Sequence, residues 1–102
     1  MKAVWKYPVP IAEDFELEMP RGARPLCVQV QREEPQLWAL VTPGQAGEIR
    51  HFRLTGTGHP LEYGPEQFLV HIGTFQVKGG ALIFHVFEVL PIDRPDSQGE
   101  AR

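Results

Sequence analysis

Proline and glycine interrupt this chain so often that long helices are disfavoured. The sequence of 102 residues contains ten of each, and both residue types break regular structure or favour turns. Between them, apolar and polar residues alternate with a period of two, as along Phe15-Glu16-Leu17-Glu18-Met19, which is typical of a half-buried strand. We therefore expect a mainly β fold with little helix, in which about seven short antiparallel strands form a small sandwich or partly open barrel.

The length limits the chain to one hydrophobic core. We expect a single β domain over residues 1–91 and a charged, disordered tail over residues 92–102. The most hydrophobic run, residues 81–90, is apolar on both faces, which indicates a central strand or a strand covered by another subunit. This pattern predicts a homo-oligomer.

Glycines also mark two local features of the predicted sheet. Adjacent Gly79 and Gly80 predict a tight hairpin turn after Lys78, because such turns need positive φ angles. An isolated Gly73 inside an apolar run predicts a β-bulge or a point where another backbone approaches closely.

Charge and cysteine content exclude several classes of protein. A formal net charge of −3 argues against broad nucleic-acid binding, which needs a basic face. A single cysteine, Cys27, excludes an internal disulfide and a multi-cysteine zinc site. We find no apolar run of about 20 residues to span a bilayer and no recognisable signal peptide, so we expect a cytoplasmic protein with no membrane partner.

The polar residues of the second half suggest a ligand site. All four histidines lie there, close to Arg53 and a Gly-Thr-Gly run. An arginine fork and glycine-rich backbone suit phosphate or carboxylate groups, and an aromatic ring can stack on a base. The alternative is a solvated arginine beside glycines that merely form a turn. The predicted ligand-binding residues are Trp38, His51, Arg53, Gly56, Thr57, Gly58, His59 and His71.

The same residues give little support for catalysis or metal binding. Ser97 is the only serine and asparagine is absent, which argues against a serine-based triad. The histidines show no recognisable zinc-ligand spacing. Residues 56–58 do not open a helix as a dinucleotide-binding loop would. We therefore assign no catalytic residue, no metal and no cofactor, although acid/base chemistry by a histidine stays open.

Several sequence blocks resemble a known family. They are Trp5-Lys6-Tyr7-Pro8, Leu37-Trp38-Ala39-Leu40-Val41, Phe52-Arg53, Gly56-Thr57-Gly58-His59-Pro60, Ile72-Gly73-Thr74 and residues 79–88, which include Phe84-His85-Val86-Phe87. Together they resemble a family of small uncharacterised β-rich proteins carried by bacteriophages, prophages and some bacteria, over about residues 1–88. The resemblance implies a phage or mobile-element context and brings no established activity.

Three hypotheses for the function follow. The first is a non-enzymatic phage-type protein that sequesters a small anionic or nucleotide-like ligand, for example a host immune signal, in the host cytoplasm. The second is a phage protein that docks on a host or virion protein through an apolar surface. The third is a small enzyme that uses histidine acid/base chemistry.

Overall fold

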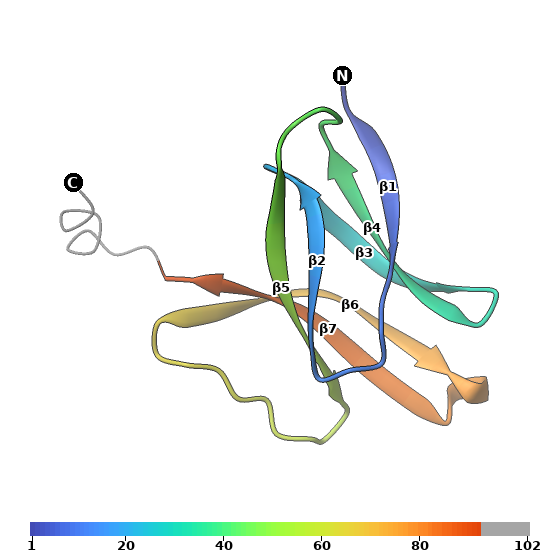
Figure 1. Ribbon diagram of the computed structural model, residues 1–102. Coiled ribbons are helices and arrows are strands. Elements are labelled where there is room, and N and C mark those ends of the chain that lie inside the picture. The colour runs from blue at the N-terminus through green and yellow to red at the C-terminus, as the bar shows by residue number, and fades with distance from the viewer. Residues whose placement is uncertain (93–102) are drawn as a thin grey trace.

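Seven antiparallel strands form two sheets in the computed structural model, which describes residues 1–92 (Figure 1). In chain order the elements are β1 (Ala3–Pro8), β2 (Asp14–Pro20), β3 (Arg24–Gln31), β4 (Glu34–Val41), β5 (Gly47–Gly56), β6 (Gln67–Val77), the 3₁₀ turn η1 (Lys78–Gly80) and β7 (Leu82–Pro91). One sheet has the strand order β1-β4-β3 and the other β2-β5-β7-β6. The expected mainly β, seven-stranded fold is confirmed, with the two sheets arranged as a sandwich.

The hydrophobic core lies between the two sheets and follows the period-two pattern of the strands. On β4, Leu37, Ala39 and Val41 are all fully buried, whereas the residues between them are partly exposed. From the other sheet, Phe52 packs its ring on Phe15 with centroids 5.3 Å apart. The buried apolar residues are Val9, Phe15, Met19, Ala23, Val28, Leu37, Ala39, Val41, Phe52, Leu54, Phe75 and Val86.

The hairpin between β6 and β7 has the turn that its glycines predict. Lys78, Gly79 and Gly80 all have positive φ angles, of 54°, 65° and 91°. Glycine adopts this region without a steric penalty, so the two glycines allow the chain to reverse within η1. The turn sets the register in which Thr74 lies opposite His85.

Gly73 has both of the features that its position predicts. The register between β6 and β7 shifts between His71 and Gly73, which is a β-bulge. A Cβ atom placed on Gly73 would lie 3.1 Å from the backbone nitrogen of Val28 on β3. The missing side chain thus lets β3 approach β6, and the two sheets close against each other on this side.

Strand β7 is central in its sheet, as its two apolar faces predict. It pairs with β5 between two cross-strand pairs, Phe52 opposite Glu88 and Gly56 opposite Phe84. It pairs with β6 along its whole length. Before Phe52, β5 continues beside β2 alone, and after Glu88, β7 continues beside β6 alone. The sheet therefore divides at Glu88, and the free end of β6–β7 runs away from the three-stranded sheet (Figure 1).

The described part ends just beyond this division. The tail expected over residues 92–102 lies outside the described residues except for Ile92, whose backbone nitrogen donates to the Glu66 carbonyl at 2.8 Å. Within residues 1–92, we find no helix of sufficient length and apolar character to cross a membrane.

Candidate functional site

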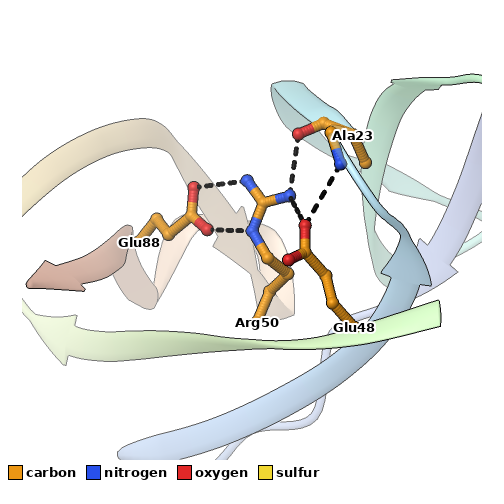
Figure 2. Close-up of polar contacts among 5 residues, drawn as sticks. Ala23, Glu48, Arg50 and Glu88 are labelled. Atoms are coloured by element: carbon orange, nitrogen blue, oxygen red, sulfur yellow. Dashed lines mark hydrogen bonds and ion pairs between the residues drawn. The ribbon is translucent and has the colours of Figure 1, made fainter. Parts of the chain in front are cut away.

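A buried ion pair joins β5 and β7 at the point where the sheet divides (Figure 2). The Arg50 guanidinium donates from Nε to Glu88 Oε2 at 2.5 Å and from Nη2 to Glu88 Oε1 at 3.1 Å. Its Nη1 donates to the Ala23 carbonyl at 2.8 Å and lies 3.5 Å from Glu48 Oε2. Glu48 Oε2 also accepts a bond from the Gly22 backbone N–H at 3.1 Å.

This pair stabilises the fold and leaves little capacity for a ligand. Glu88 is only 4% exposed and is the one buried charged residue of residues 1–92. Its hydrogen bonds raise the pKa of the Arg50 guanidinium above the usual value, although burial opposes the rise. Because Arg50 also reaches Ala23, just before β3, it connects the two sheets. The sequence marks each of the two residues separately, since a charged residue interrupts an apolar face on each strand, but it does not indicate that they pair.

A second polar group lies on the opposite, outer face of the same sheet. It consists of Thr57, His71, Thr74 and His85, which we call the imidazole–hydroxyl cluster. Thr57 Oγ1 lies 2.7 Å from His85 Nε2, and Thr74 Oγ1 lies 2.9 Å from His85 Nδ1. Thr74 Oγ1 is also 3.2 Å from His71 Nε2. The hydroxyl of Thr74 thus connects two imidazole rings whose centroids are 6.5 Å apart.

Local features of three segments bring this cluster together. Thr74 lies directly opposite His85 in the β6–β7 register. His71 is three residues before Thr74, so in a regular strand the two side chains would point to opposite faces. The bulge before Gly73 inserts one extra residue and returns both to one face. Thr57 is held beside β7 because its backbone N–H donates to the Ile83 carbonyl at 3.3 Å.

An aromatic ring and an arginine continue the outer face towards β2. Phe87 lies 5.2 Å from His71 between ring centroids and is opposite Arg53 in the β5–β7 register. Arg53 donates from Nε to Asp14 Oδ1 at 2.6 Å and from Nη1 to the Glu62 carbonyl. It therefore anchors the loop after β5 to the sheet, and these two bonds use two of the five N–H groups of its guanidinium.

The other sequence-predicted residues of this sheet are dispersed around the cluster. His51 Nδ1 lies 3.3 Å from Glu16 Oε2, and both side chains are 60% exposed. His51 and Arg53 line a cavity of about 660 Å³ beside the division of the sheet. His59 packs its ring over Gly56, and both line a second cavity of about 500 Å³.

Trp38 lies far from these residues because it belongs to the other sheet. It is on β4, between Lys6 of β1 and Cys27 of β3, and faces away from the core. Lys6 Nζ lies 5.6 Å from the centroid of the ring. The Trp38 Nε1 atom is buried and has no hydrogen-bond partner among residues 1–92.

The structure therefore groups only Thr57 and His71 of the eight predicted residues in the imidazole–hydroxyl cluster. Gly58 lies next to Thr57 and has a φ angle of 86°, which suits the turn after β5. The sequence did not predict Thr74 and His85 as members of the site. Strand pairing between residues 71–77 and 82–87 would have indicated them, but only once the bulge had been placed.

The cluster offers hydrogen-bond donors and titratable groups on an open surface. Hydroxyl and imidazole groups can donate to the oxygens of an anion, and an imidazole can also carry a proton at mildly acidic pH. Phe87 adds an apolar ring at one end, against which a planar group can pack. Within residues 1–92, no group of three or more His, Cys, Asp or Glu side chains is arranged to hold a metal ion.

Comparison with known proteins gives a family and no function. No curated protein and no solved structure matches the chain. A family model matches residues 1–95, which is nearly the whole chain. The protein belongs to the family defined by DUF7352, a domain of unknown function.

Proposed function

We propose that the protein binds a small anionic, nucleotide-like ligand on the outer face of the four-stranded sheet. The ligand's phosphate lies at the imidazole–hydroxyl cluster, and its base packs against Phe87. One observation carries the proposal: two hydroxyls and two imidazoles from three segments meet within 2.7 to 3.2 Å of one another on an accessible surface. Hydroxyl and imidazolium donors are suited to phosphate oxygens.

The charge around the cluster also favours an anion. The hydrogen bonds of the four side chains join them to one another, and within residues 1–92 none goes to a carboxylate. The outward carboxylates of β2 lie beyond β5, where Asp14 pairs with Arg53 and Glu16 with His51. A phosphate bound at the cluster is therefore not repelled by these carboxylates, since each is paired with a basic side chain.

The positions of the family-like sequence blocks support the same site. Thr57 lies in the Gly-Thr-Gly-His-Pro block, Thr74 ends the Ile-Gly-Thr block, and His85 belongs to the Phe-His-Val-Phe block. These three blocks are distant in sequence and meet at the cluster. From the resemblance, we extend the proposal to a phage-carried, non-enzymatic protein that sequesters a host immune signal in the host cytoplasm.

A calorimetric titration with a panel of linear and cyclic nucleotides tests the binding site. His85→Gln and Thr74→Val are expected to weaken binding about tenfold each, because each removes hydrogen bonds to a charged group. Arg53→Gln on β5 and His59→Gln in the loop after it are the matched controls and are expected to bind normally. Loss of affinity in the controls alone would move the site to the loop after β5. Recovery of the bound nucleotide intact distinguishes sequestration from turnover.

A second candidate function is association with another copy of the chain through the free end of β6–β7. Phe68, Val70 and Ile92 are 42%, 39% and 37% exposed there, and this end is not covered by the three-stranded sheet (Figure 1). A two-stranded ribbon is marginally stable in water without such cover. Light scattering on Phe68→Ser/Val70→Ser should show a smaller species than the wild type, with Val4→Ser, at an apolar residue of the other sheet that is 55% exposed, as a control. A monomeric wild type would remove this candidate.

A further inference from the structure

At neutral pH the hydrogens of the imidazole–hydroxyl cluster satisfy its three contacts and leave at most one of its two hydroxyl hydrogens for a ligand. Each threonine hydroxyl has one hydrogen to donate, and a neutral imidazole has one N–H and one acceptor nitrogen. Both ring nitrogens of His85 contact a hydroxyl, Nε2 that of Thr57 and Nδ1 that of Thr74. One of these two nitrogens must therefore accept, whichever tautomer is present.

A neutral His85 thus uses one threonine hydrogen inside the cluster. If Nδ1 carries the proton, Thr57 donates its hydrogen to Nε2. If Nε2 carries the proton, Thr74 donates its hydrogen to Nδ1. In either tautomer one hydroxyl is turned inward and offers only lone pairs to the surface, and lone pairs repel a phosphate oxygen.

Protonation of His85 reverses this arrangement. Both ring nitrogens then donate, so both hydroxyls accept from His85 and neither needs to donate to it. The Thr57 hydrogen is free to point outward. The Thr74 hydrogen is free as well when His71 donates from Nε2, which lies 3.2 Å from the same oxygen. One proton on His85 therefore adds a positive charge and also releases a hydroxyl donor.

We propose that the imidazole–hydroxyl cluster is a proton-switched phosphate site, in which uptake of a proton by His85 turns the threonine hydroxyls towards the ligand. The inference rests on the proposed function and specifies how that site is regulated. It also specifies what is recognised: a phosphate group contacted by outward-facing hydroxyls beside an imidazolium. Binding and protonation are then reciprocally linked, so each favours the other.

The surroundings of His85 hold few groups that could titrate in its place. On the neighbouring strand β6 the titratable side chain is His71. The outer face of β5 carries Arg53, which is held by Asp14 of β2, and His51, which lies beside Glu16 of β2. Lys78 lies in η1, at the far end of the β6–β7 hairpin. In the loop after β5, His59 packs over Gly56, and the Glu62 backbone carbonyl accepts from Arg53. The imidazoles that contact the two hydroxyls are therefore those of His85 and His71.

The test uses 3′,5′-cyclic AMP, whose phosphodiester keeps the same charge over this pH range, so the ligand itself does not titrate. A histidine ordinarily titrates near pH ~6.5. Affinity should consequently rise about tenfold between roughly pH 7.5 and 5.5. Calorimetry at about pH 6.5 in two buffers of different ionisation enthalpy should show net proton uptake on binding. His85→Gln should bind more weakly and should lose most of the pH dependence.

Two further variants separate the switch from simple charge attraction. The double variant Thr57→Val/Thr74→Val removes whichever hydroxyl is released but keeps the shape and both imidazoles, and it should lose most of the gain in affinity at low pH. Thr42→Val, at a threonine that bonds Lys2 on the other sheet, is the control and should behave as wild type. If the double threonine variant and His85→Gln weaken binding equally at every pH, and the wild type takes up no proton on binding, the switch is overturned and the proposed function stands. No binding at any pH would overturn both.

Discussion

Strand β7 has a polar cluster on each of its faces, and the two clusters differ in almost every physical property. On the inner face, Glu88 is buried and forms a bidentate ion pair with Arg50. On the outer face, three residues earlier, His85 contacts two neutral hydroxyls on an accessible surface. The inner pair has matched charges and fixed partners, whereas the outer cluster has hydrogens that can be redistributed.

The difference shows which cluster is suited to structure and which to binding. A buried charge is tolerated only when it is paired and hydrogen-bonded, so the loss of one member of the inner pair leaves the other uncompensated and destabilises the fold. The outer cluster loses little if one contact is replaced by water, because its atoms are accessible. The following predictions use this contrast, beginning with the largest expected effect.

Breaking the inner ion pair should destabilise the protein more than any change on the outer face. Glu88→Ala leaves the partly buried Arg50 charge without its main partner. Breaking a buried pair typically costs about 3–5 kcal/mol, and we expect a loss at the lower end of this range because Glu48 stays 3.5 Å from Arg50 Nη1. For a domain of this size that is a large share of the total stability. The free energy of unfolding from urea denaturation measures the loss. A loss below about 1 kcal/mol would show that Arg50 is solvated by another route.

The double variant Arg50→Met/Glu88→Leu sharpens the same prediction. It replaces both charges with apolar side chains of similar volume, so no buried charge is left unpaired. Such replacements are often neutral or stabilising. We expect the double variant to be more stable than Glu88→Ala, with ligand affinity at the outer face unchanged.

Two phenylalanines on opposite faces of β7 provide a second test of the contrast. Phe84 packs against the core with its ring 5.6 Å from Phe75, whereas Phe87 contacts His71 on the outer face. Both are half-buried, so Phe84→Ala should cost about 2 kcal/mol, below the range for a fully buried phenylalanine. Phe87→Ala should cost less stability and more ligand affinity. Thermal unfolding measures the stability of both variants, and nucleotide titration measures their affinity. If Phe87→Ala lost more stability and Phe84→Ala more affinity, the ligand would bind on the inner face and not on the outer face.

How far the sequence predicts the molecule depends on the range of the contacts involved. The period-two alternation along residues 15–19 and the glycines at 79 and 80 act locally, and they predict the strands and the turn correctly. Arg50 and Glu88 are 38 residues apart, and no local pattern indicates that they meet. Their pairing depends on β7 lying next to β5, a strand order that periodicity does not contain.

The candidate site shows the same limit more sharply, because it depends on the bulge before Gly73. Gly73 itself predicts a bulge, but the consequence for His71 and Thr74 follows only when β6 is aligned with β7. Trp38 shows the complementary problem. Its ring suits base stacking in principle, yet the assignment of β4 to the other sheet separates it from the histidines.

The smallest expected effect is that of Trp38→Phe, which tests this separation directly. The substitution removes a buried N–H that has no partner among the described residues, and such a group costs about 1–3 kcal/mol when it is desolvated. It also weakens the contact with the Lys6 ammonium, worth about 0.5–1 kcal/mol at an exposed site. Because the two changes oppose each other, the net change in stability should be within about 1 kcal/mol in urea denaturation. Nucleotide affinity should stay the same, since the ring lies on the far sheet. A marked fall in affinity with unchanged stability would show that the ligand contacts β4 and that Trp38 belongs to the site after all.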